Sequence, residues 1–235
     1  MRIAVFSDVH ANVQALQAVL EAADRLGADE RWCLGDLVGH GADAAACVQA
    51  IQDRCELVLA GNHDLMACGK SRAVAPEPVA ITLAHARQQL TGEQLDWLRN
   101  LPSITARHGV TAMHASPLDP AWDFISSLQE ASQALDRLSA LSVFGHTHTP
   151  IAFVRRLPTR RTVERIDPTD RPELQLDDFS QALLNGGAAG RPWNGAWIAR
   201  WMMLDTGQRT VRWHHATYDT KQTFAALSAA ALPLR

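Results

Sequence analysis

Short apolar runs that each end in aspartate, asparagine or histidine are the feature that most constrains how this chain can fold. Five polar segments directly follow such runs: Asp8–His10, Gly35–Asp36, Gly61–Asp64, His114 and Gly145–His148. In open α/β sheets, ligands bind at the carboxyl ends of the strands. If each run is a strand, the sheet brings all five segments to one rim. The sequence therefore predicts one binding site assembled from five separate strand ends.

The first third of the chain alternates strand-like and helix-like patterns. Apolar runs at residues 2–6, 31–34 and 56–60 are typical of strands buried on both faces. The segments between them, residues 13–27 and 42–54, have helical spacing. Asn12 is placed to cap the first of these helices. This order favours parallel strands joined by helical crossovers.

The rest of the chain adds helices in the middle and strands toward the end. The expected helices cover residues 76–90, 93–101 and 129–139. The expected strands cover residues 103–107, 110–114, 141–145, 151–156, 162–166, 181–185, 197–205 and 208–215. The strand-rich part after Pro150 predicts a second, more antiparallel sheet that packs on the first within one domain, residues 1–235. The polar, proline-containing stretch 167–178 is expected to be a surface loop.

Composition limits the classes of partner. The 235 residues are 47% hydrophobic and carry a net charge of −3, so the chain can bury a full core but has no basic excess for a nucleic-acid backbone. A nucleic-acid partner is therefore disfavoured. No apolar run is long enough to cross a bilayer, and the N-terminus lacks a signal-peptide pattern. We expect a cytoplasmic protein without a membrane partner, whose four cysteines, lacking a CxxC pair, are unpaired.

The polar segments have the composition of a metal site. Carboxylate, imidazole and amide groups suit a borderline-hard divalent ion such as manganese, iron or zinc. In D-x-H and H-x-H the two side chains point to the same face of an extended segment. A single structural zinc needs only four ligands, whereas two ions that share a bridging carboxylate would use all seven candidates: Asp8, His10, Asp36, Asn62, His114, His146 and His148. Two ions about 3.5–4 Å apart are the usual device for in-line attack at phosphorus.

The order D-x-H, G-D, G-N-H-D, H, G-H-x-H resembles the calcineurin-like metallophosphoesterases. Within them it is similar to the small bacterial and archaeal branch that includes YfcE-type phosphodiesterases. The resemblance runs from Met1 to about Asp205 and includes Cys33–Gly39, Leu90–Leu98 and an Asn185-Gly-Gly segment. It implies an α/β fold, a four-layer α-β-β-α sandwich with two facing mixed sheets.

The resemblance also implies the reaction: hydrolysis of a phosphodiester or phosphomonoester by a hydroxide that bridges two divalent metal ions. Manganese is the first choice, with iron, zinc, nickel or cobalt as alternatives. Asp8, His10 and His148 would hold the first ion. Asn62, His114 and His146 would hold the second, and Asp36 would bridge both. His63 would be the catalytic residue that contacts a phosphoryl oxygen or protonates the leaving alcohol.

Further residues near these motifs also bear on the site. Protein-phosphatase relatives carry an aspartate at the position of Gly39 that supports the catalytic histidine, so what orients His63 is not evident and protein phosphatase activity is disfavoured. We expect His40 to be a partly exposed loop residue, with substrate contact as the alternative. Asp64 is expected to cap a helix. Arg191 and Trp193 share one loop, where a phosphate contact and a stacked nucleobase are the alternatives to structural roles.

The expected partner is a small phosphorylated substrate or a nucleotide. One alternative function is hydrolysis of a dinucleoside polyphosphate. Another is a non-catalytic scaffold that keeps the fold only for interactions. Scaffolds of this kind typically lose ligands or the catalytic histidine, and this chain keeps all of them, which favours the enzyme. A homo-oligomer is compatible with the sequence.

Overall fold

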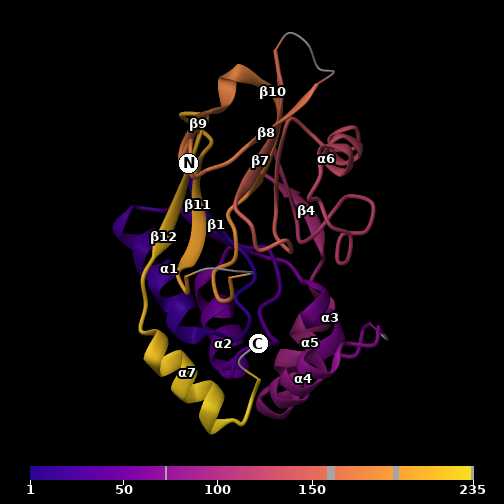
Figure 1. Cartoon of the computed structure of the whole chain (residues 1–235), viewed down its shortest axis with the longest axis vertical. Helices are drawn as coiled ribbons and strands as arrows, with labels where there is room; N and C mark the ends of the chain where they lie inside the picture. The colour runs from indigo at the N-terminus through magenta and orange to yellow at the C-terminus, as the bar shows by residue number, and fades with distance from the viewer. Residues whose placement is uncertain (72, 158–161, 193–195, 234–235) are drawn as a thin grey trace.

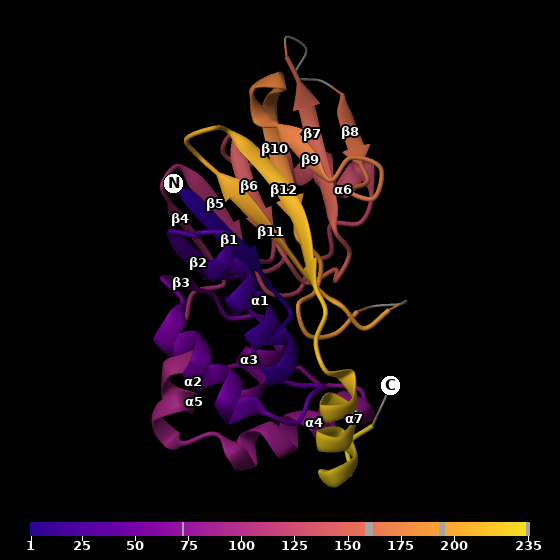
Figure 2. The ribbon, with the colours of Figure 1, turned by 90° about the vertical axis from the view of Figure 1, so that its left-hand side faces the viewer.

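A computed structural model describes residues 1–71, 73–157, 162–192 and 196–233, and its strands form two facing six-stranded sheets (Figures 1 and 2). The first sheet has the order β3-β2-β1-β11-β12-β9. Its strands are β1 (Arg2–Phe6), β2 (Glu30–Cys33), β3 (Leu57–Val58), β9 (Glu173–Gln175), β11 (Ala199–Asp205) and β12 (Thr210–Ala216). The pairs β1–β2 and β2–β3 are parallel and the others are antiparallel, so this sheet is mixed.

The second sheet has the order β4-β5-β6-β10-β7-β8. Its strands are β4 (Ile104–Arg107), β5 (Val110–Met113), β6 (Leu141–Phe144), β7 (Ile151–Arg156), β8 (Val163–Ile166) and β10 (Phe179–Asn185). Strands β5, β6 and β10 are parallel neighbours, and the remaining pairs are antiparallel. Two mixed sheets confirm the predicted architecture.

Helices cover the outer face of each sheet. The helices are α1 (Val13–Arg25), α2 (Ala44–Arg54), α3 (Asn62–Ala67), α4 (Glu77–Gln89), α5 (Gly92–Asn100), α6 (Leu128–Leu135) and α7 (Thr220–Ala229), with a short 3-10 turn at Leu176–Asp178. Helix α1 packs on the first sheet and α6 on the second, on the opposite sides of Figure 1. None of the described helices is long and apolar enough to span a membrane.

The alternation of side chains along each strand explains the layers. In β1, Ala4 and Phe6 pack among the helices, while Ile3 and Val5 join the cluster between the sheets. Successive residues of a strand point to opposite faces, so a continuous apolar run fills two cores at once. The resulting layers are helix, sheet, sheet and helix.

The distribution of the later strands differs from the sequence-based expectation. We predicted that the strands after Pro150 form a second sheet by themselves. Instead β9, β11 and β12 complete the first sheet, and β11 pairs antiparallel with β1 along Arg2–Asp205 and the following residues. In the parallel unit β1–β2–β3, one edge of β1 has no partner, and β11 pairs with that edge. Strands β7, β8 and β10 join β4, β5 and β6, which precede Pro150.

The segment 167–178 is also more ordered than a surface loop. It contains β9 and the 3-10 turn, in which Leu174 and Leu176 are buried between the sheets. Two apolar residues in a polar stretch are too few to show a strand period. Helix α7 was not predicted either. All four cysteines are unpaired, as expected.

A buried carboxylate links the first sheet to the edge strand β4 of the second. Glu30 of β2 accepts hydrogen bonds from Trp32 Nε1 at 2.7 Å and Arg107 Nη2 of β4 at 2.7 Å, and it contacts His108 Nε2 at 2.9 Å. Burial by itself would raise the pKa of Glu30. The bonds from Arg107, Trp32 and His108 outweigh burial and lower this pKa from 4.5 to about 2.

We expect Glu30→Gln to lower the free energy of unfolding by about 2 kcal/mol at pH 7. Because the folded pKa lies below the unfolded one, the Glu30 contribution is present above pH 4.5 and is lost as pH falls toward 2. Urea denaturation at pH 7 and at pH 3.5 should therefore show a smaller pH effect in Glu30→Gln than in the wild type. Glu56→Gln, at an exposed carboxylate, is the control and should change little. An unaltered pH effect in Glu30→Gln would contradict this assignment.

Candidate metal centre

The five polar segments meet where the carboxyl ends of the two sheets come together. Asp8 and His10 follow β1, Asp36 follows β2, and Asn62 and His63 begin α3 after β3. His114 follows β5, and His146 and His148 follow β6 in the second sheet. The sequence placed all of them on the rim of a single sheet, whereas the structure divides them between two rims that face each other.

Hydrogen bonds between backbone and side chains tie the two rims together. The N–H of His146 donates to Asp8 Oδ2 at 3.1 Å. The His114 ring reaches back to the first sheet, where its Nδ1 lies 2.9 Å from the carbonyl oxygen of Leu34. The side chains of the site are therefore fixed relative to both sheets.

Most of the predicted ligands lie on left-handed backbone. The φ angles are 57° for Asp8, 48° for His10, 53° for Asp36, 64° for His146 and 55° for His148. Non-glycine residues seldom adopt this conformation, and each such residue costs on the order of 1–3 kcal/mol. Strain of this kind persists where the surrounding structure fixes it, commonly at functional sites. Here the left-handed residues turn the chain sharply after each strand and direct their side chains into the space between the sheets.

The predicted ligands form two groups. In the first, His10 Nε2 lies 3.0 Å from His148 Nε2, which lies 3.4 Å from Asp8 Oδ1. In the second, His114 Nε2 lies 3.2 Å from Asn62 Oδ1, and the rings of His114 and His146 have centroids 5.0 Å apart. The ligand atoms of Asp8, His10 and His148 lie within 4.8 Å of one another, as do those of Asp36, His114 and His146. All seven predicted ligands are thus brought together.

Asp36 lies between the two groups. Its Oδ2 is 3.7 Å from His10 Nε2 in the first group, and its Oδ1 is 3.6 Å from His114 Nε2 in the second. One carboxylate therefore directs one oxygen toward each group, which is the arrangement of a bridging ligand.

The donor set fits divalent metal ions. Ligands about 2.1 Å from a shared ion lie roughly 3.0–3.4 Å apart at tetrahedral or octahedral angles, close to the separations found here. Backbone carbonyls hold the far nitrogens of two rings, Val38 O at 3.3 Å from His10 Nδ1 and Leu34 O at 2.9 Å from His114 Nδ1. This leaves each Nε2 to face its group, the usual orientation of a metal-binding histidine.

Burial keeps the imidazoles in the form that binds a cation. It lowers the pKa of His10 well below the ordinary value, and the neighbouring His40 and His63 lower it further. Burial likewise lowers the pKa of His114 to about 4. Neutral imidazoles with free lone pairs are the state that accepts a metal ion.

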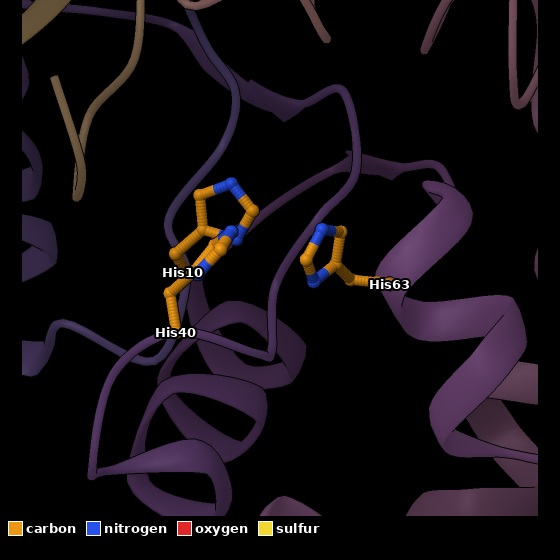
Figure 3. A group of neighbouring side chains, drawn as sticks. All are labelled: His10, His40 and His63. Atoms are coloured by element: carbon orange, nitrogen blue, oxygen red, sulfur yellow. The ribbon is translucent and has the colours of Figure 1, made fainter. Parts of the chain in front are cut away.

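His63 lies beside the first group (Figure 3). Its ring is 4.8 Å from that of His10 and 4.7 Å from that of His40, and its Nε2 is 4.0 Å from Asp36 Oδ2. The ring nitrogens of His10, His40 and His63 also lie within 4.8 Å of one another. His10 already belongs to the first group, so His40 and His63 line the space next to it.

The structure accounts for the orientation of His63 without the supporting aspartate. Its backbone N–H donates to Asp36 Oδ1 at 2.9 Å, and its ring packs against those of His10 and His40. A Cβ at Gly39 would collide with His63 Nδ1, so glycine there makes room for the ring. No described residue forms a hydrogen bond with that nitrogen.

Asp64 joins the two loops that carry Asp36 and His63. The sequence predicted that Asp64 caps a helix; it is instead the third residue of α3, and its Oδ2 accepts a hydrogen bond from the N–H of the N-cap residue Gly61 at 2.9 Å. Its Oδ1 also accepts from the N–H groups of Leu37 at 2.9 Å and Val38 at 3.1 Å. The carboxylate therefore ties the loop after β2 to the start of α3.

We expect Asp64→Asn to lower the free energy of unfolding by about 1–3 kcal/mol, because an amide cannot accept on both sides and would leave one buried N–H unpaired. Urea denaturation measures this change. The matched control is Asp53→Asn, which alters an exposed side-chain contact with Gln49 on α2 and should change stability little. Equal stability losses in the two variants would contradict the role given to Asp64.

Neighbouring residues also surround the site. His40 is a partly exposed loop residue, as expected, and it also faces the site, since it contacts the rings of His10 and His63 and its Nδ1 contacts Arg191 Nη1. Asn12 caps α1 as predicted, and its Nδ2 also donates to the carbonyl of Gly190 at 2.7 Å. It thereby holds the loop of Arg191, while Trp193 lies outside the described residues.

Phe124 was missed by the sequence reasoning. Its ring lies 4.3 Å from that of His146 at an angle of 38°. It belongs to an irregular segment between β5 and α6, where no period or motif marks it as part of the site.

Comparison with known families identifies the class of this fold and site. The model of the calcineurin-like phosphoesterase superfamily domain matches residues 1–209. This chain belongs to that superfamily. It is therefore a phosphoester hydrolase of a metal-dependent family, as its motifs predicted. The side-chain groups that could hold a metal lie where the strands of its two sheets end.

The relatives of this phosphoesterase agree with the fold. A metallophosphoesterase from Sphaerobacter thermophilus has 31% identity and a TM-score of 0.86, covering 99% of this chain and 95% of its own. The hypothetical protein PH1004 from Pyrococcus horikoshii, at 16% identity and TM-score 0.80, covers 99% of this chain and 94% of its own and shows the same fold. The uncharacterized protein MJ0912 from Methanocaldococcus jannaschii is 29% identical over 98% of this chain and 93% of its own length.

Two other relatives are named after an enzymatic activity. A symmetrical bis(5′-nucleosyl)-tetraphosphatase from Chromohalobacter salexigens is 33% identical over 73% of this chain and 62% of its own length. A second, from Glaesserella parasuis, is 32% identical over 53% of this chain and 47% of its own. This chain spans about half to three-fifths of the length of these tetraphosphatases.

Proposed function

We propose that this phosphoesterase binds two divalent ions and hydrolyses a nucleotide-type phosphoester. The observation that carries the proposal is the position of Asp36, with one carboxylate oxygen toward each of two groups of ligands. Asp8, His10 and His148 would hold one ion, Asn62, His114 and His146 the other, and Asp36 both. Two such ions, when bound, supply Lewis-acid polarisation of phosphoryl oxygens and an activated water.

Manganese is the first candidate for both ions. The ligand atoms are carboxylate and amide oxygens with imidazole nitrogens, a set that suits manganese, iron and zinc better than soft thiophilic ions. No cysteine belongs to the clusters of possible metal ligands among the described residues.

His63 is proposed as the catalytic residue that is not a ligand. In contrast to His10 and His114, its Nδ1 has no hydrogen bond to a described residue. That nitrogen is buried against Gly39, whereas Nε2 lies 4.0 Å from Asp36 Oδ2, a position from which it would hold a phosphoryl oxygen or deliver a proton to the leaving alcohol. Its packing against His10 and His40 restricts its rotation, as such a role requires.

Arg191 is proposed to bind the substrate's negative charge. It is half-buried beside His40, and burial lowers its pKa without a carboxylate to offset this. A buried guanidinium without an anionic partner is suited to bind a phosphate that enters the site. None of the ion pairs within the described parts of the chain involves Arg191.

We expect Arg191→Ala to raise KM for a phosphoester about tenfold or more, with a smaller change in kcat, because one charge-assisted contact is lost. Steady-state kinetics at saturating manganese measures both constants. Arg212→Ala removes an exposed arginine paired with Glu173 and should leave KM unchanged. A KM unaffected by Arg191→Ala would remove Arg191 from the binding site.

The substrate class is supported by the relatives named as tetraphosphatases. Their names refer to a bis(5′-nucleosyl) tetraphosphate, so a dinucleoside polyphosphate or another nucleotide is the proposed substrate here. The half-buried Arg191 favours a substrate with more than one phosphate, since a second phosphoryl group would give it a partner.

The decisive test is hydrolysis of bis-p-nitrophenyl phosphate and of diadenosine tetraphosphate with added manganese, together with the metal content of the protein. We expect turnover with manganese and none after chelation. Bound ions without turnover of any phosphoester would favour the scaffold alternative. Turnover of the artificial diester alone would support the chemistry and overturn the nucleotide substrate.

A further inference from the structure

We propose that a cavity beside His146 binds a nucleobase of the substrate, with the ring of Phe124 as its stacking surface. This inference rests on the proposed function, because it names the part of the substrate that this phosphoesterase holds next to the reacting phosphate.

The cavity has the lining of a small-molecule site. Its volume is about 270 Å³, and it is lined by Phe124, Ile125, Ser126, Thr147, Thr149, Ile151 and Arg165. This volume lies just below the range of about 300–1,000 Å³ that whole-ligand sites commonly span, so the cavity suits one part of a substrate, and its apolar walls with a few polar groups are typical of such sites. Here one aromatic ring and two isoleucines supply the apolar wall, and hydroxyl groups with one exposed arginine supply hydrogen-bond partners.

The cavity adjoins the second group of ligands. The Phe124 ring lies 4.3 Å from the ring of His146, and the cavity wall includes Thr147, which separates His146 from His148 in the chain. Thr147 is fixed in turn, because its Oγ1 accepts a hydrogen bond from Asn185 Nδ2 at 3.1 Å. Phe124 and Thr147 therefore place the cavity next to His146, within reach of the rest of a substrate whose phosphate lies there.

Phe124 is presented in a way that suits stacking. Half of its surface, 50%, is exposed, while the next residue, Ile125, is 2% exposed and anchors the segment in the core under α6. Since its ring also packs against His146, the Phe124 side chain is held in place although much of it faces solvent.

A nucleobase fits this combination better than other apolar groups. It has a flat π face for Phe124 and an edge of donors and acceptors for Thr149 and Arg165. It is also linked through its ribose to a phosphate, which matches a cavity whose wall includes Phe124 and Thr147 beside His146. An aliphatic chain would leave these polar groups without partners.

The test is binding of adenosine, which carries no phosphate and cannot be hydrolysed. Zinc-loaded protein is titrated with adenosine, and with ribose as the comparison, by saturation-transfer NMR on the ligand protons. We expect saturation of the base protons of adenosine and no comparable signal for ribose. Phe124→Ala should weaken adenosine binding about tenfold or more, because an aromatic stacking partner of a base contributes on the order of 1–3 kcal/mol.

Two control variants make the result specific. Phe124→Tyr keeps the ring and should bind adenosine nearly as well as the wild type. Leu128→Ala truncates an apolar residue of the same exposed fraction, 50%, that does not line the cavity, and should not change binding. Unchanged binding in Phe124→Ala, or equal losses in Phe124→Ala and Leu128→Ala, would overturn the proposal.

The failure of this inference and of the proposed function can be told apart. Adenosine binding that depends on Phe124, without hydrolysis of any phosphoester, would support the cavity and overturn the proposed function. Manganese-dependent hydrolysis without adenosine binding by the wild type would overturn the nucleobase site alone.

Discussion

Replacing His63 with alanine is expected to reduce kcat about 10²- to 10⁴-fold while the protein keeps its metal ions. The loss follows from the removal of a group positioned to contact a phosphoryl oxygen or to donate a proton, for which general acid–base catalysis contributes this range. The metal content should persist because each of the two groups of ligands is complete without His63. Metal analysis and steady-state kinetics on the same preparation test both statements.

Two results would contradict the role of His63. An empty metal site in His63→Ala would make His63 a ligand, a possibility raised by its proximity to His10 and His40. Unchanged turnover would remove it from the reaction. His215→Ala, at an exposed position on β12, is the control and should retain both activity and metal.

Replacing Asp36 with asparagine is expected to remove at least one metal ion and to lower turnover by at least about a thousandfold. The amide has nearly the same shape but lacks the charge and has only one oxygen, so it cannot serve both groups of ligands. Losing the charge stabilisation supplied by an ion at phosphorus raises the barrier by several kcal/mol.

The same substitution should reduce the effect of metal on thermal stability. Ions that bind only the folded wild type raise its unfolding midpoint, so chelator should lower the midpoint of Asp36→Asn by less than that of the wild type. Burial raises the pKa of Asp36, and the carboxylates of Asp64 and Asp8 raise it further, so metal-free protein gains nothing from the charge at this position. Two ions retained in Asp36→Asn would contradict the bridging arrangement. Asp64→Asn is the informative comparison, because it should lose stability whether or not metal is present.

The seven candidate ligands could be predicted because each one is marked locally. A short apolar run followed by aspartate, asparagine or histidine implies a strand end, and the ends of neighbouring parallel strands meet. That argument needs no knowledge of which strands are neighbours across the sandwich. It therefore brought together Asp8 and His146, which are far apart in sequence, although it assigned them to one sheet rather than two.

The features of the fold and site that the sequence did not predict depend on contacts between residues far apart in the chain. Strand β11 pairs with β1 across nearly the whole chain, and nothing in the run at 197–205 distinguishes that partner from a strand of the other sheet. His40 faces the site because its backbone is left-handed and Arg191, 151 residues later, meets its ring. Phe124 lies in an irregular segment whose path is set by Ile125 beneath it. These contacts arise only in the folded protein, and no periodic pattern in the sequence predicts them.

The division of the site between two sheets also has a consequence for how the protein matures. Neither group of ligands can form within one sheet: the first needs His148 from beyond β6, and the second needs Asp36 from beyond β2. A nascent chain that has completed only the N-terminal β-α-β-α-β unit therefore lacks part of each proposed ligand group. If the proposed function holds, complete metal binding follows the docking of the two sheets. The bound ions would then slow the separation of the sheets and link the lifetime of the protein to the supply of metal.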